Sequence, residues 1–327
     1  MRLVLHAGTH KTGTTSLQRI LAANRDVLRH RGYLYPLFRA EKTSHNPFAH
    51  ELALCGPDGV GDLRRRISAG AGRDETVVVS AEELSARILG TRYWDGFDGE
   101  DYWDRRRAYL ARLRGVLADF DEIAVHLCFR RHDDYAEALY ATKVLSGQVR
   151  GAFGEFRSQC APLFDYRAQL DAFRAVFDDV RIASYEALRP DVVTNMLDWI
   201  GLPALPDTGA RANVTPDARL VFWHRHRSTG DRHRKAVLER ARFVRTGGVS
   251  AGPGRSTLWA SPEERQEFLG RCTDPEPGFF PPAPGRKETV SADLGEAQMR
   301  DIDRAFKDWR RRNGRFAGLF PDLFGGR

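Results

Sequence analysis

A short glycine loop near the start of the chain carries the residue types that bind anions. Gly8 and Gly13 enclose a segment that holds Lys11, and threonines lie both within and behind it. An apolar run at 3–5 precedes the loop, and apolar residues at helical spacing follow it, at positions 17, 20 and 21. This order predicts a strand, a loop and a helix. Backbone N–H groups at the positive N-terminus of such a helix bind a phosphate or a sulfate.

The position of the lysine separates this loop from a nucleoside-triphosphate loop. That loop reads G-x-x-x-x-G-K-[ST] and places a hydroxyl on Mg²⁺. Here Thr14 stands where the lysine is required, and Lys11 lies two residues before Gly13 instead. A lysine there reaches the anion from another side, while Thr12, Thr14 and Thr15 offer uncharged hydroxyl donors. The pattern favours a donor substrate that needs no metal ion.

The run Lys11-Thr12-Gly13-Thr14-Thr15, with His6 before it and Leu17-Gln18 after it, resembles the loop of a known enzyme family. It is similar to the 5′-phosphosulfate loop of sulfotransferases that use PAPS (3′-phosphoadenosine 5′-phosphosulfate), above all bacterial members and carbohydrate sulfotransferases. The resemblance covers about residues 1–36 and 76–217. It implies a P-loop-like fold, PAPS as co-substrate and transfer of a sulfuryl group to a hydroxyl. An ordinary strand-to-helix turn and a variant nucleotide kinase are the other interpretations of the loop.

A second group of candidate residues follows the strongest central-strand pattern of the chain, at 123–129. Arg130 comes directly after this run. In the sulfotransferases an arginine at this place, with a serine eight residues later, binds the 3′-phosphate of PAPS. Arg130 matches that pattern, whereas Ala138 occupies the serine position. The lost hydroxyl contact is worth ~1 kcal/mol and a charged arginine–phosphate bond about twice as much, so we expect phosphate binding to survive. Arg131 or Lys143 could compensate, and a surface arginine at a helix start is the alternative for Arg130.

Two carboxylates, Glu82 and Glu83, follow the short apolar strand at 76–80 and resemble an S-x-E run of the bacterial relatives. Transfer to a hydroxyl requires a base within hydrogen-bond reach of its proton, and we predict Glu82 in this role. The alternative is that both acids only favour a helix N-terminus through its dipole. Histidines at 6, 10, 45 and 50 are rival bases, and we expect His10 and His50 to face the acceptor.

The resemblance implies in-line sulfuryl transfer, in which positioning and charge stabilisation carry the catalysis, as in phosphoryl transfer. Gly8 and residues 11–15 would bind the 5′-phosphosulfate, with Lys11 neutralising charge on the bridging oxygen. Thr12 or His10 would contact the sulfuryl oxygens. No metal is expected, because a sulfuryl group carries less charge than a γ-phosphoryl group.

The order of predicted elements indicates an α/β protein. Strands at 3–5, 76–80, 123–129 and 180–184 alternate with helices at 81–88, 102–120, 130–144, 170–177 and 191–200. We therefore predict a three-layer, P-loop-like fold with a central parallel sheet flanked by helices, and a ligand at the carboxyl edge of that sheet. Beyond about residue 205 the strand signal disappears, and helices are predicted at 218–226, 232–244, 262–271 and 292–312.

Length and composition, 327 residues of which 42% are hydrophobic, suit one elaborated α/β domain or two smaller ones. We predict a single sulfotransferase domain over 1–327, with a PAPS-binding core at 1–205 and a helical elaboration at 206–327. No run reaches the ~18 apolar residues of a membrane span, and the first strand begins where a signal peptide would lie. We therefore expect a cytoplasmic protein without stable membrane insertion. The four cysteines are dispersed, so neither a zinc site nor a disulfide framework is indicated.

The formal net charge of +7 favours an anionic ligand or partner. The basic clusters are far apart and no nucleic-acid module accompanies them, so we expect no nucleic-acid partner and interpret most clusters as solvated helix faces. The run at 223–235 suits an acidic acceptor best. A glycan, a lipid, a peptide tyrosine or a small natural product could accept the sulfuryl group, and the carbohydrate likeness favours a sugar alcohol. A P-loop phosphotransferase and a non-catalytic polyanion-binding or nucleic-acid-binding protein remain the alternative functions, and the sequence does not indicate an oligomeric state.

Overall fold

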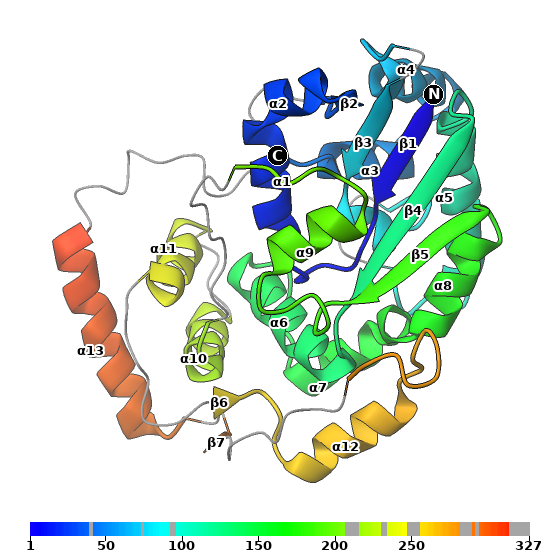
Figure 1. Ribbon diagram of the computed structural model, residues 1–327. Coiled ribbons are helices and arrows are strands. Elements are labelled where there is room, and N and C mark those ends of the chain that lie inside the picture. Colours follow the sequence, from blue (N-terminus) through cyan, green and yellow to red (C-terminus); the bar gives the residue numbers. More distant parts are fainter. Residues whose placement is uncertain are drawn as a thin grey trace. The chain divides into compact units, whose positions relative to one another are not determined.

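A five-stranded, all-parallel sheet lies at the centre of the N-terminal part of the computed structural model (Figure 1). The structure describes residues 1–38, 42–72, 75–91, 96–206, 216–229, 234–246, 256–281, 290–291 and 294–313. The strand order is β2-β3-β1-β4-β5. The strands are β1 (Arg2–His6), β2 (Tyr33–Leu34), β3 (Thr76–Ser80), β4 (Glu122–Phe129) and β5 (Asp179–Ser184). The central position of β1 places its following loop between the ends of β3 and β4, and the predicted parallel sheet is confirmed.

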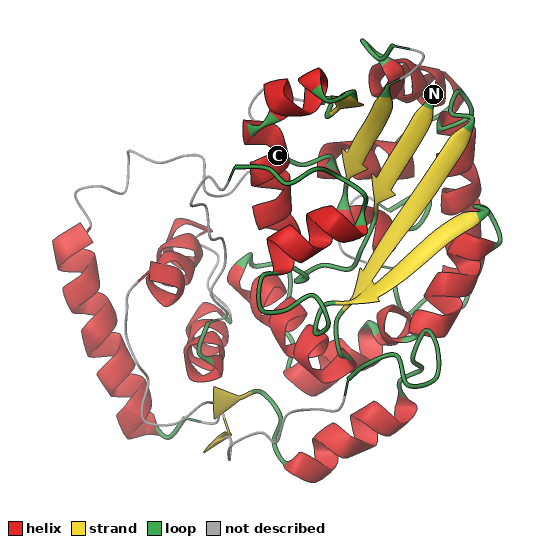
Figure 2. Cartoon of the chain, viewed as in Figure 1, coloured by secondary structure: helices red, strands yellow, loops and turns green. Residues whose placement is uncertain are grey.

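Helices cover both faces of this sheet (Figure 2). On one face α1 and α9 pack through Leu17, Leu21 and Met196 against Val78 and Cys128 of the strands. On the other face α5 packs against α8 and α4. The helical elements of this part are α1 (Thr14–Ala23), α2 (Arg25–His30), α3 (Asn46–Leu54), α4 (Pro57–Ser68), η1 (Glu82–Ser85), α5 (Tyr102–Val116), α6 (His132–Leu145), α7 (Phe153–Gln159), η2 (Ala161–Phe164), α8 (Tyr166–Arg174) and α9 (Val192–Trp199). The three layers match the fold class expected from the sequence.

The chain divides into two compact units. The first comprises residues 1–135, 157–213 and 269–282, and the second comprises 136–156, 214–268 and 283–327. The C-terminal elements are α10 (Ala218–Ser228), α11 (Arg234–Thr246), β6 (Ser256–Thr257), α12 (Pro262–Arg271), β7 (Val290–Ser291) and α13 (Glu296–Asn313). Within the second unit, Trp223, Phe243 and Trp309 join α10, α11 and α13 around an aromatic core. The predicted helical C-terminal part is confirmed.

One predicted helix was wrong, and two groups of elements were not predicted. The segment 81–88 forms only the 3₁₀ turn η1, because Nη1 of Arg106 on α5 binds the carbonyl oxygens of Leu84 and Arg87 at 2.7 and 2.8 Å. In a continuing α-helix the Leu84 oxygen would accept from the N–H four residues later. Strands β2, β6 and β7, of two residues each, are too short to produce a periodic pattern. Helices α3 and α4 occupy a stretch for which no element was predicted, and each begins with a proline in its first turn.

Parts of the C-terminal predictions lie outside the described residues: 207–215, 230–233, 247–255, 282–289, 292–293 and 314–327. The middle of the basic run at 223–235 is among them. Within the described part of the chain, no helix has both the length and the apolar character that a membrane span requires.

Candidate functional site

The loop between β1 and α1 contains two residues in the left-handed backbone conformation. Lys11 and Gly13 both have positive φ, at 68° and 84°, and Gly13 is the N-cap of α1. Left-handed residues in such a turn direct successive N–H groups to one side. The first turn of α1, which begins at Thr14, lies at the positive end of the helix dipole. The predicted strand, loop and helix are confirmed.

Close contact with β4 fixes the loop. The N–H and the hydroxyl of Thr9 both donate to the Cys128 carbonyl, at 2.9 and 3.0 Å. A Cβ on Gly8 would lie 2.8 Å from the Cys128 backbone nitrogen, so only glycine allows this approach. Thr12 is fully buried and its hydroxyl donates to the Thr9 carbonyl at 2.7 Å. The Thr12 hydroxyl therefore stabilises the loop from within. Thr14 is buried and Thr15 half-buried in the first turn of α1.

Arg130 lies against this loop. Its Nη1 donates to the Lys11 carbonyl oxygen at 3.1 Å, and its guanidinium lies 5.1 Å from the ring centroid of Tyr185, just after β5. Its Nε is buried and has no hydrogen-bond partner among the described residues. Burial lowers the pKa of Arg130, and nearby Tyr185 and Glu186 oppose that shift. An arginine nonetheless stays protonated at neutral pH, so a second cation adjoins the loop.

The two residues expected to compensate for Ala138 have other surroundings. Arg131 is bound to the carboxylates of Asp133 and Asp134 at 2.9 and 3.1 Å, at the start of α6. Its guanidinium is therefore engaged in the helix terminus. Ala138 and Lys143 are both buried residues of α6 and belong to the second compact unit.

The adjacent carboxylates of η1 have different partners. Glu82 is buried, and its Oε2 accepts a hydrogen bond from Nε2 of Gln18 on α1 at 2.5 Å. Oε1 of Glu83 lies 3.2 Å from Nε2 of His10, while its Oε2 accepts from Nε of Arg87 at 2.8 Å. Glu83 was not among the predicted catalytic residues. Its spacing of four from Arg87, typical of ion pairs on helices, is the signal in the sequence that could have indicated a fixed carboxylate.

The other candidate histidines differ in their environments. His50 on α3 is 40% exposed at its side chain, and its Nε2 lies 3.9 Å from Oε1 of Glu83. His6 contacts the Ser80 hydroxyl through Nδ1 at 2.9 Å, and burial lowers its pKa to about 3. His45 accepts from the Ser80 N–H at 2.8 Å, and burial lowers its pKa to about 4. His6 and His45 are thus neutral framework residues that join β1, β3 and α3.

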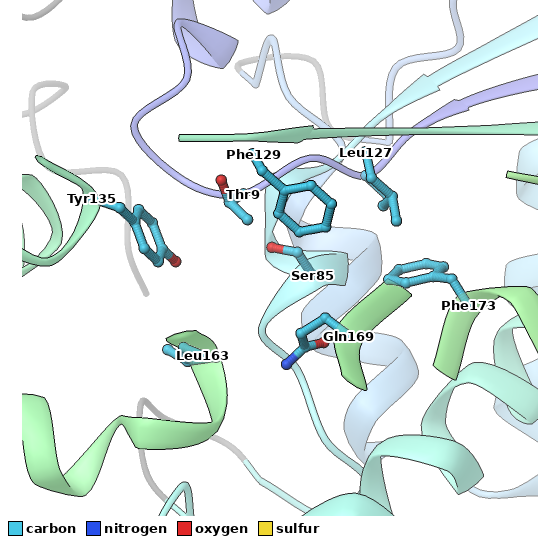
Figure 3. A pocket seen from close by; sticks show the side chains of 9 residues that line it. Thr9, Ser85, Leu127, Phe129, Tyr135, Leu163, Gln169 and Phe173 are labelled. Carbon is cyan, nitrogen blue, oxygen red and sulfur yellow. The ribbon is translucent and has the colours of Figure 1, made fainter. Parts of the chain in front are cut away.

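A narrow cavity adjoins the loop on the α8 side of the sheet. Figure 3 shows Thr9, Ser85 and Gln169 at its wall together with apolar side chains such as Phe129 and Phe173. The space open to the centre of a water molecule is about 10 Å³, which is roughly what one water needs. This cavity is too small for an organic acceptor. Among the described residues, no group of three or more His, Cys, Asp or Glu side chains is arranged to hold a metal ion.

Comparisons with known proteins give one structural likeness. No protein-family model and no curated protein matches the sequence. Among solved structures, a sulfotransferase from Alicyclobacillus acidocaldarius aligns with 73% of this chain and 95% of its own, with 19% sequence identity and a TM-score of 0.38.

Proposed function

We propose that this protein is a sulfotransferase that moves a sulfuryl group from PAPS to a hydroxyl acceptor, on a sugar, a lipid or a small natural product. The observation that carries the proposal is the hydrogen bond from Nη1 of Arg130 to the Lys11 carbonyl, 3.1 Å long. It brings the cation at the end of β4 to the anion-binding loop after β1. A donor with phosphate groups at two separated positions of one nucleotide suits such a pair of cationic sites.

The residues of the loop fit the 5′-phosphosulfate end of this donor. The left-handed turn at Lys11 and Gly13 and the N-terminus of α1 supply N–H donors and a positive dipole. Arg130 fits the 3′-phosphate, because its buried Nε has no hydrogen-bond partner among the described residues. A guanidinium binds phosphate through two parallel N–H donors. The place of Lys11, with Thr14 where a triphosphate loop has its lysine, favours this donor over a nucleoside triphosphate.

Transfer in this site is a single displacement. The acceptor oxygen bonds to sulfur as the bond between sulfur and the bridging oxygen breaks, and the acceptor loses its proton to a base. The Lys11 ammonium would neutralise the charge that develops on the departing 5′-phosphate, and the N–H groups of the loop would hold that phosphate in place. Fixed donors of this kind need no rearrangement during the reaction.

Isothermal titration calorimetry with 3′-phosphoadenosine 5′-phosphate (PAP) and with ADP tests the proposal. PAP should bind more tightly, because Arg130 recognises its 3′-phosphate, which ADP lacks. Equal affinity for both nucleotides, or affinity for neither, would refute the sulfotransferase assignment. Tighter binding of ADP with Mg²⁺, and Mg²⁺-dependent turnover of ATP, would favour a phosphotransferase instead. Salt-sensitive binding to DNA without affinity for either nucleotide would favour a polyanion-binding protein.

A further inference from the structure

Of the two carboxylates on η1, Glu83 is the one that contacts the donor-binding loop. Its Oε1 lies 3.2 Å from Nε2 of His10, the residue directly before Lys11. The Glu82 carboxylate accepts from Gln18 on α1 instead. Two neighbouring carboxylates in one turn therefore have different roles: Glu82 joins η1 to α1, and Glu83 joins η1 to the loop.

Several contacts fix the position of Glu83. Nε of Arg87 donates to its Oε2 at 2.8 Å, and the Asn46 side-chain oxygen accepts from its backbone N–H at 3.3 Å. The turn itself is stabilised by Arg106, which is fully buried and binds the carbonyls of Leu84 and Arg87. A carboxylate restrained in this way can hold an imidazole in one orientation and one tautomer.

His10 is the histidine of this cluster that belongs to the donor loop. Glu83, Arg87 of the segment after η1 and His50 of α3 form one charged and titratable cluster with it, and Lys11 is its neighbour in the chain. The side chains of His10 and Glu83 are each 12% exposed, and both ring nitrogens of His10 are buried. Because His10 directly precedes Lys11, a base here would act beside the residue assigned to the leaving oxygen.

We propose that His10 is the base that removes the acceptor proton and that Glu83 is its positioning residue. This inference rests on the proposed sulfotransferase function. The acceptor O–H proton passes to the ring nitrogen of His10 that does not face Glu83, while the acceptor oxygen bonds to sulfur. The bond from sulfur to the bridging oxygen breaks, and its electron pair leaves on the 5′-phosphate of PAP. Glu83 holds the ring and stabilises the imidazolium formed, as the carboxylate does in a nucleophile–histidine–carboxylate triad.

Four variants of the full chain separate this assignment from a role for Glu82: His10→Ala, Glu83→Gln, Glu83→Asp and Glu82→Gln. Glu82→Gln is the matched comparison, since it neutralises a carboxylate in the same turn. The assay follows PAP release from PAPS across pH with water in place of the unidentified acceptor, which forms PAP and sulfate. PAP affinity by calorimetry and circular dichroism show that each variant is folded and still binds the nucleotide.

His10→Ala should lower the rate of PAP release by about 10²–10⁴-fold, the usual range for a lost general base, and remove the fall in rate at acidic pH. Glu83→Gln should lower the rate at least about tenfold with unchanged PAP affinity, and Glu83→Asp should restore part of it. In Glu82→Gln the rate of PAP release should still decrease at acidic pH, as it does in the wild type. If Glu82→Gln removes that fall while His10→Ala keeps it, the inference is overturned. Wild-type protein that releases no PAP from PAPS would contradict the proposed function itself, and with it this inference.

Discussion

The guanidinium of Arg130 donates a hydrogen bond to the main-chain carbonyl of Lys11, 119 positions away in the sequence. The bond joins the end of β4 to the loop after β1, and these two strands are neighbours in the sheet. The Arg130 guanidinium is thereby fixed against the backbone of Lys11, at the carboxyl edge of the sheet. The candidate site is consequently a product of strand order, because Lys11 and Arg130 follow two strands that are far apart in the sequence and adjacent in the sheet.

Substitutions of Lys11 separate its charge from its backbone conformation. Lys11 has a φ of 68°, which costs a residue with a Cβ roughly 1 kcal/mol relative to glycine. Lys11→Ala and Lys11→Gly should both lower PAP release from PAPS by about 10²–10³-fold, the usual effect of losing a group that stabilises charge in the transition state. In urea unfolding, Lys11→Gly should be at least as stable as Lys11→Ala. Full turnover in both variants would contradict the role of the ammonium group.

The approach of Gly8 to β4 predicts a specific loss of stability. In Gly8→Ala the new Cβ would lie 2.8 Å from the Cys128 backbone nitrogen, so the loop or β4 must shift. We expect the free energy of unfolding to fall by about 1–3 kcal/mol and PAP affinity to fall with it. Gly56→Ala is the control, because Gly56 has a φ of −77° and a Cβ added there would meet no atom within 4 Å beyond its chain neighbours. Equal stability of the two variants in urea would argue against a tightly fixed loop.

Buried neutral histidines should make the fold sensitive to acid. Burial lowers the pKa of His126 to about 4, and neither of its ring nitrogens has a hydrogen-bond partner among the described residues. The unfolded chain therefore binds a proton below about pH 6.5 that the folded chain does not accept until about pH 4. The contribution of His126 to the free energy of unfolding is complete above about pH 6.5 and is lost as the pH falls from about 6.5 to about 4.

His126→Phe tests this effect. The ring of His126 lies edge-on to Trp199 at a centroid distance of 4.9 Å, and phenylalanine can keep that contact. Between about pH 6.5 and 4 the variant should lose about 1–3 kcal/mol less unfolding free energy than the wild type. His226→Gln, at an exposed position of α10, should leave the pH dependence unchanged. Identical acid sensitivity in wild type and His126→Phe, measured by urea unfolding, would show that His126 does not contribute.

The sheet and the loop could be predicted from the sequence because local residue patterns indicate both of them. The apolar run that forms β4 and the glycine loop before α1 are recognisable without any long-range contact. The turn at 82–85 is not, because it is Arg106 on another helix that binds the carbonyls a longer helix would use. The different partners of Glu82 and Glu83 likewise depend on Gln18 and His10, which approach them only in the folded chain. Local spacing could place two carboxylates at the site but could not assign their contacts.

The central claim is that Arg130 recognises a 3′-phosphate beside the anion-binding loop. The direct test is calorimetry of PAP and of AMP, which differ only in that phosphate, with wild type, Arg130→Ala and the exposed control Arg181→Ala. Wild type and the control should prefer PAP. Arg130→Ala should reduce the ratio of PAP to AMP affinity by about 10–150-fold, the equivalent of a charged hydrogen bond of about 1.5–3 kcal/mol. A ratio that Arg130→Ala leaves unchanged would contradict the account.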